Sequence, residues 1–296
     1  MRRIFRLLFI LALLGGGTFW LLTRPSTLPA DTFAGLTGDV TRGEPVFWAA
    51  GCASCHMAEG ATGDAQLVLS GGKKFPSDFG TFTAPNISPD PTQGIGGWDL
   101  PMFANAVMRG VSPDGQHLYP VLPYAAYNKM ALQDVADLKS FMDTLPPSAA
   151  PSLPHDIRFP FTLRRGLGLW KLLFVKTDWA VPGDLPAPAA RGRYIAEALA
   201  HCGECHTPRN PIGGLQRGAW LSGAPDPSGK GTIPNITPGK LNWTKDEIAE
   251  YLTTGFTPDF DSVGGLMAHV VGNMARLPET DRQAVAAYLK QVPAIP

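Results

Sequence analysis

All the cysteines of this chain stand in one repeated pattern, C-x-x-C-H, which can hold a large cofactor. Its two copies contribute Cys52, Cys55 and His56, and Cys202, Cys205 and His206. The two thiols of one copy can add to the two vinyl groups of a porphyrin, and the histidine that follows can then ligate the iron from below. The sequence therefore predicts two covalently bound c-type haems.

Other uses of paired cysteines fit this pattern less well. A zinc site would need its two pairs about 15–20 residues apart, whereas these pairs lie 150 residues apart. A thioredoxin-like site would leave both the second copy and the following histidine unexplained. A disulfide within C-x-x-C would close a loop too short to stabilise a fold.

The two halves of the chain also resemble each other outside the haem motifs, which indicates a duplicated domain. Each half has a helical stretch before its motif and an apolar helical pattern near its end. The repeated segments are 86–89 with 235–238, 110–114 with 255–259, and 132–145 with 279–292. This order predicts an all-α fold of two tandem class I cytochrome c domains. Their expected bounds are residues 31–148 and 188–296.

A proline-rich linker, residues 149–187, is expected between the two domains. Within it, residues 164–176 form a short basic amphipathic segment that contains Leu167, Trp170, Leu173 and Phe174. One interpretation is a strap that packs the domains together. The other is a contact with the membrane surface or with a partner.

The first 30 residues have the character of a signal or a membrane anchor. Arg2, Arg3 and Arg6 precede an uncharged stretch, 7–22, and Arg24 follows it. This stretch is a little shorter than the roughly 20 residues of a typical membrane span, so a cleaved signal peptide is one reading. Phe19 and Trp20 favour an uncleaved anchor, because aromatic residues gather at the membrane interface. In either case the arginines place the rest of the chain outside the cytoplasm.

Several further stretches resemble one known family. They are 71–75, 85–91, 94–98, 118–124, 202–210, 234–238 and 255–265. The chain is similar in them to the cytochrome c subunits of periplasmic, membrane-bound alcohol, gluconate and aldehyde dehydrogenases, and closest to a two-haem branch in bacterial inner membranes. The resemblance implies a carrier on the periplasmic face, with a dehydrogenase as electron donor and a terminal oxidase or soluble cytochrome c as acceptor. The larger subunits carry three haem motifs, so their particular partner enzymes do not transfer directly.

The distal iron ligands are expected to be methionines. In the first half Met130 lies in the loop before the closing helix and matches the two-haem branch, whereas Leu122 stands where many relatives have the ligand. Three further methionines of this half, Met102, Met108 and Met142, are expected to pack in the core. In the second half Met267 fits the family pattern, with Met274 as its rival.

Iron held by histidine and methionine has no open position, so it passes single electrons and does little else. The leading hypothesis is therefore an electron carrier. The alternative is a dihaem enzyme, such as a peroxidase or a thiosulfate-oxidising cytochrome, whose first haem is left open by Leu122. The balance of 25 basic against 25 acidic residues removes any case for nucleic acid.

Overall fold

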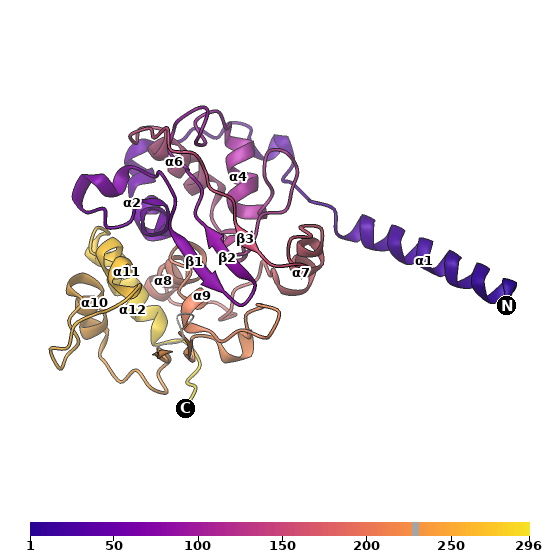
Figure 1. The fold of residues 1–296 in the computed structure, drawn as a ribbon. Coiled ribbons are helices and arrows are strands. Elements are labelled where there is room, and N and C mark those ends of the chain that lie inside the picture. The colour runs from indigo at the N-terminus through magenta and orange to yellow at the C-terminus, as the bar shows by residue number, and fades with distance from the viewer. Residues whose placement is uncertain (227–230) are drawn as a thin grey trace.

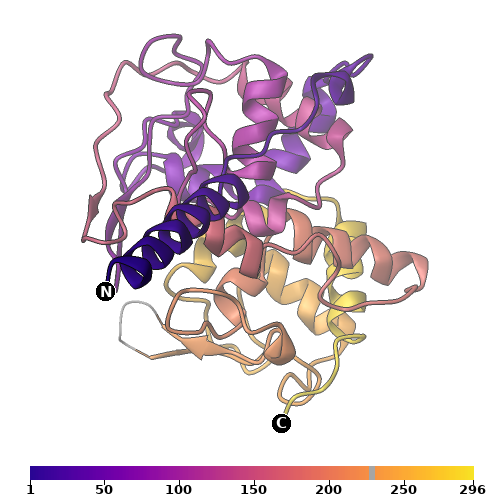
Figure 2. The same cartoon turned by 90° about the vertical axis from the view of Figure 1, so that its right-hand side faces the viewer.

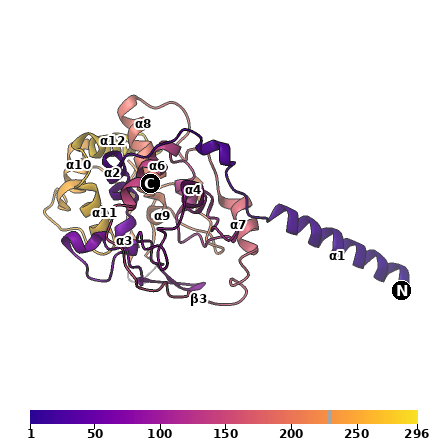
Figure 3. The same ribbon diagram turned by 90° about the horizontal axis from the view of Figure 1, so that it is seen from above.

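One long helix stands apart from the rest of the molecule. The computed structural model describes residues 1–226 and 231–296, and helix α1 (Arg2–Leu22) has no buried residue. Its mean hydropathy reaches 1.9 over 18 residues, which makes it long and apolar enough to cross a membrane. Figures 1 and 3 show α1 projecting from the body that all the other elements form. Helix α1 is therefore a candidate membrane anchor.

The first half of the body is built on two crossing helices, α2 and α6. Its elements are η1 (Ala30–Phe33), α2 (Val40–Ala50), α3 (Cys52–His56), η2 (Gly63–Leu67), β1 (Lys74–Ser77), β2 (Gly80–Thr83), α4 (Leu100–Arg109), α5 (Tyr124–Tyr127) and α6 (Leu132–Met142). Helix α2 begins at the cap Asp39, whose side chain accepts a bond from Arg42 N. At the crossing, a Cβ on Gly43 would lie 2.0 Å from the carbonyl oxygen of Asp137. Glycine is needed there because nothing larger fits.

The second half repeats this crossing with α8 and α12. Its elements are α8 (Ala187–Tyr194), the π-helical turn η3 (Ile195–Leu199), α9 (Gly203–His206), η4 (Arg217–Ala219), β4 (Ala224–Pro225), β5 (Thr232–Ile233), α10 (Lys245–Thr254), α11 (Met267–Met274) and α12 (Glu279–Leu289). A Cβ on Gly192 would lie 1.8 Å from the carbonyl oxygen of Ala284. Gly192 therefore allows α8 and α12 to approach each other closely, as Gly43 does for α2 and α6.

The fold is mostly helical, but the all-α expectation was too strict. Strand β3 (Asp156–Ile157), from the segment between the halves, pairs with β2, and β2 pairs with β1, in an antiparallel three-stranded sheet. Strands β4 and β5 form a second, two-stranded sheet. These strands are two to four residues long. Such short pairings carry almost no period-two signal, so the sequence did not reveal them.

The two halves pack against each other where α11 and the residues just after it meet α2 and α3. Asn273 Nδ2 donates to Ser54 Oγ at 2.9 Å, and the Arg276 guanidinium lies 4.0 Å from the ring centre of Trp48. Figure 2 shows the first half above and the second half below, with this boundary between them. Helix α7 (Gly166–Phe174) of the linker lies beside both halves.

Two of the three methionines expected to pack in the first core do so. Met108 and Met142 are buried, with exposed fractions of 7% and 3%. The expectation was wrong for Met102, which is 40% exposed. It follows Pro101 in the first turn of α4, on the side of the helix away from the core.

Candidate haem sites

The first motif is a single helical turn set at an angle to α2. Gly51 ends α2 with a left-handed φ of 67°, and α3 begins at the next residue. His56 ends this turn, and its Nδ1 lies 2.8 Å from the carbonyl oxygen of Pro85. Its own carbonyl accepts a bond from Gly71 N at 2.7 Å. The imidazole is thus held by a loop that is distant in sequence.

The second motif repeats these contacts. His206 Nδ1 lies 2.8 Å from the carbonyl oxygen of Pro234, and the His206 carbonyl accepts from Gly223 N at 2.7 Å. Leu69 and Leu221, close to these glycines, each have no exposed surface. The two histidines therefore sit in the same local frame.

The donors of both motifs suit a c-type haem. Burial lowers the pKa of His56 and of His206, although the bond to the proline carbonyl opposes this in each case. A neutral imidazole whose Nδ1–H is donated to a carbonyl presents Nε2 as the metal ligand. The two cysteines of each motif are not bonded to each other. Burial raises the pKa of the Cys52 and Cys202 thiols to about 12.

The methionines proposed as distal ligands differ in burial. Met130 is 4% exposed and lies in the core of the first half. Met267 is the first residue of α11 and is half-buried against the core. Met274 is the last residue of α11 and is 2% exposed. The rivalry between Met267 and Met274 stays open. In the described part of the chain, no cluster of three or more His, Cys, Asp or Glu side chains could hold a bare metal ion.

Some site residues escaped the sequence reasoning. The carbonyls of Pro85 and Pro234 hold the imidazoles of His56 and His206, and the repeated Pro-Asn-Ile segments that contain these prolines were the available signal. Glu197, which is 2% exposed, accepts bonds from Ala180 N at 2.5 Å and from Tyr288 Oη at 2.6 Å. No motif marks such a buried carboxylate in advance.

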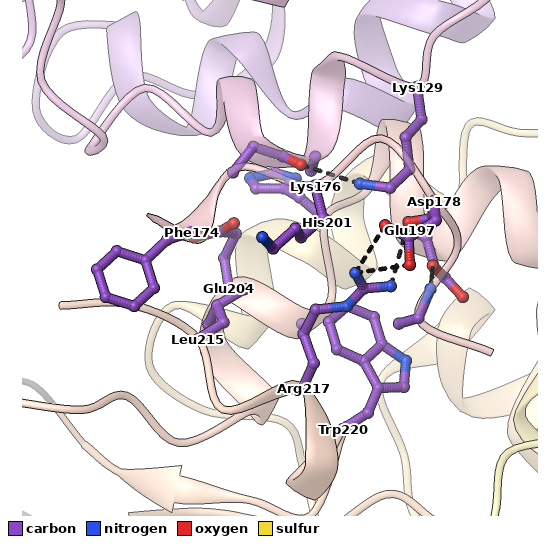
Figure 4. A pocket seen from close by; sticks show the side chains of 14 residues that line it. Lys129, Phe174, Lys176, Asp178, Glu197, His201, Glu204, Leu215, Arg217 and Trp220 are labelled. Carbon is purple, nitrogen blue, oxygen red and sulfur yellow. Dashed lines mark hydrogen bonds and ion pairs between the residues drawn. The ribbon is translucent and has the colours of Figure 1, made fainter. Parts of the chain in front are cut away.

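A pocket lies beside the second motif, between the two halves and the linker. Figure 4 shows Lys129 of the first half, Asp178 of the linker, and Glu197 and Arg217 of the second half around it. Arg217 is paired with Asp178. Burial lowers the pKa of Lys129, and the Glu197 charge opposes this. The pocket is thus lined by charges of both signs next to the chain that leads into Cys202.

A short chain of contacts links the two motifs. Tyr127 Oη donates to the carbonyl oxygen of Ala50, two residues before Cys52, at 2.7 Å. The ring of Tyr127 lies 5.5 Å from that of His201, the residue before Cys202. Burial, followed by the nearby Cys52 and Cys55, raises the pKa of Tyr127. The approaches to the two haem attachments are therefore in contact across the boundary between the halves.

Crossed helices, a C-x-x-C-H turn and a carbonyl-bonded histidine together define a c-type cytochrome. The cytochrome c family model matches residues 40–146. A dihaem c-type cytochrome of Cereibacter sphaeroides is 56% identical over 295 residues, an alignment that covers 100% of each chain. The chain belongs to the family of dihaem c-type cytochromes, and it carries two covalently bound haems with their iron.

More distant relatives are subunits of larger complexes. The cytochrome subunit of fructose dehydrogenase from Gluconobacter japonicus is 36% identical over 272 residues, 86% of this chain and 53% of that one. The cytochrome c subunit of a quinone alcohol dehydrogenase from Gluconobacter oxydans is 33% identical over 273 residues, 87% of this chain and 55% of that one. The chain thus spans about half the length of these dehydrogenase subunits. The resemblance inferred from the sequence is confirmed.

Proposed function

We propose that this protein is a membrane-anchored periplasmic electron carrier. In this role it takes single electrons from a dehydrogenase and passes them toward a terminal oxidase or a soluble cytochrome c. The contact from Ala50 through Tyr127 to His201 carries the proposal, because it joins the segments that lead into the two haem motifs, as a carrier that passes electrons between its haems requires. The subunits of fructose and alcohol dehydrogenases among the relatives support a dehydrogenase as donor.

The proposed ligand sets are His56 with Met130 for the first iron and His206 with Met267 for the second. The haem supplies reversible one-electron chemistry at a six-coordinate iron. The protein keeps each imidazole neutral and in one orientation through the Pro85 and Pro234 carbonyls. The thioether sulfur favours the reduced iron, so both haems would have raised potentials.

The proposed division of the chain follows the two helix crossings. Residues 31–148 contain α2 with α6, and residues 188–296 contain α8 with α12. Residues 149–187 join them, and residues 1–30 carry the anchor. The N-terminal arginines would keep the start of α1 on the cytoplasmic side and the body in the periplasm of a bacterial inner membrane.

Absorption spectroscopy and cell fractionation test this proposal. We expect two low-spin haems per chain, each with the weak sulfur-to-iron band at the red end of the ferric spectrum. The native chain should stay with the membranes until detergent is added, with its N-terminus intact. A high-spin first haem with peroxide turnover would instead favour a dihaem enzyme. Native protein in the soluble periplasmic fraction, starting beyond residue 24, would contradict the anchor.

A further inference from the structure

The outward face of α7 is apolar although it is exposed. Leu169, Leu172 and Leu173 have exposed fractions of 45%, 53% and 51%. Their spacing of three and four residues places them on one side of the helix, and we call them the leucine face. A single exposed leucine is ordinary, whereas a group of neighbouring ones indicates a surface that something covers.

The inward face of α7 already accounts for its attachment to the body. Trp170 Nε1 donates to the carbonyl oxygen of Ile212 in the second half at 2.9 Å. Lys171 Nζ donates to the carbonyls of Arg109 and Gly110 in the first half, both at 2.7 Å. The strap expected from the sequence is thus formed by this side of the helix. The leucine face takes no part in these contacts.

Helix α7 is fixed to the end of α1. A Cβ on Gly168 would lie 2.3 Å from the carbonyl oxygen of Thr23. Arg165 donates to Thr23 Oγ1 at 3.0 Å, and its guanidinium lies 4.0 Å from the ring centre of Trp20. Figures 1 and 3 both show α7 where α1 joins the body. The leucine face therefore begins at the level where α1 and its exposed Trp20 reach the body.

We propose that the leucine face of α7 lies in the lipid bilayer surface, as a second membrane contact beside α1. This inference rests on the proposed anchoring by α1. An amphipathic helix of this kind places its apolar face about 5–10 Å into the boundary between headgroups and acyl chains. A single spanning helix would let the body rotate and tilt, whereas two contacts fix its orientation. The same face of the body, and with it both haem motifs, is then always presented in one direction along the membrane.

Thiol labelling of the full-length protein in lipid nanodiscs tests this contact. The four native cysteines are consumed by haem attachment, so an introduced cysteine is the only free thiol. We expect Leu172→Cys to react with a membrane-impermeant maleimide at least about tenfold more slowly than Leu153→Cys, because lipid covers it. Leu153 is a matched control, since it lies in the same linker and is 51% exposed. Equal rates for the two variants would overturn the inference.

Two further measurements separate the possible failures. Phe9→Cys, in the middle of α1, reports the anchor itself: rapid labelling there would mean that the proposed anchoring is wrong. Protection of Phe9→Cys without protection of Leu172→Cys would overturn the second contact alone. Protection of Leu172→Cys in native membranes but not in nanodiscs would assign this face to a protein partner and also overturn the inference. Each variant must first show two haems per chain, so that misfolding is not read as exposure.

Discussion

The two halves differ at one position next to their haem motifs. Five residues before Cys52 stands Phe47, whose ring lies 5.2 Å from that of Phe141. Five residues before Cys202 stands Glu197, whose carboxylate accepts a bond from Tyr288. Phe141 and Tyr288 occupy equivalent positions. In each half, a Cβ added to the crossing glycine would lie 2.8 Å from the Cβ of this aromatic residue. An aromatic pair in one half is replaced by a buried charge and a phenol in the other.

The backbone shows how the second half accommodates this change. Cys52 stands nine positions after Gly43, whereas Cys202 stands ten positions after Gly192. The extra residue is taken up in the π-helical turn η3, which contains Glu197. Such turns are one-residue insertions in a helix and are frequent at functional sites. The insertion leaves both the helix crossing and the motif in place.

The comparison separates what the two halves share from what differs between them. The bonds that hold the motif histidines, His56 and His206, have the same lengths in both halves, 2.8 Å to the proline carbonyl and 2.7 Å from the glycine N–H. The surroundings differ, because in the second half Trp220 Nε1 donates to Tyr288 Oη at 3.0 Å, and Tyr288 Oη donates to the buried Glu197. The contacts of the two motif histidines are thus shared, while the groups packed five residues before the motifs differ.

The largest expected effects come from substitutions at the crossing glycines, a feature that both halves share. Gly43→Ala and Gly192→Ala should each reduce the free energy of unfolding by about 3 kcal/mol, because the new methyl group would meet a backbone carbonyl that cannot move aside. Urea unfolding followed by circular dichroism and the haem Soret band measures this. Gly218→Ala is the control, since a Cβ there has no atom within 4 Å. A much smaller loss for one of the two crossing glycines would show that the crossings are not equivalent.

Much of this scaffold was predictable from the sequence, and the reasons are local. The C-x-x-C-H turns, the closing helices and the similarity of the halves follow from spacing and periodicity. The short strands did not, and neither did Met102, whose exposure depends on how α4 is rotated against the core. Glu197 escaped because its role depends on Ala180 and Tyr288, which only the fold brings together.

The next effect concerns the distal ligand of the second iron. If Met267 is that ligand, Met267→His exchanges a thioether for an imidazole, a harder donor that favours Fe(III). The potential of the second haem should then fall by roughly 100 mV or more, and its sulfur-to-iron band should vanish. Spectroelectrochemical titration of both haems measures the change, and the first haem should keep its potential.

Met274→Leu is the matched control for this experiment. Met274 is buried in the core, so the substitution should change packing stability by about 1 kcal/mol and leave both potentials nearly unchanged. The opposite pattern, with Met274→Leu removing a sulfur band and Met267→His leaving both intact, would show that Met274 is the ligand. The second half would then use the buried end of α11 rather than its half-buried start.

The smallest expected effect concerns the charge of Glu197, which stands where the first half has Phe47. Glu197 accepts bonds from two backbone N–H groups and from Tyr288 Oη, an arrangement that suits the ionised, acceptor-only carboxylate. A buried negative charge stabilises Fe(III) over Fe(II), so Glu197→Gln should raise the potential of the second haem. At an effective dielectric constant of about 20, a unit charge about 10–15 Å away contributes about 1.1–1.7 kcal/mol. About 1.4 kcal/mol, or about 59 mV, changes the equilibrium constant of a one-electron transfer tenfold. The expected rise in the potential of the second haem is therefore about 50–70 mV.

Two matched variants show whether this rise belongs to the buried charge. Asp259→Asn removes an exposed carboxylate of the same half, and solvent screening should keep its effect on the potential far smaller. Phe47→Leu changes the corresponding side chain of the first half without changing charge, so the potential of the first haem should stay the same. If Glu197→Gln and Asp259→Asn shift the second haem equally, burial gives Glu197 no special influence. The two halves would then differ in packing but not in the electrostatics felt by their irons.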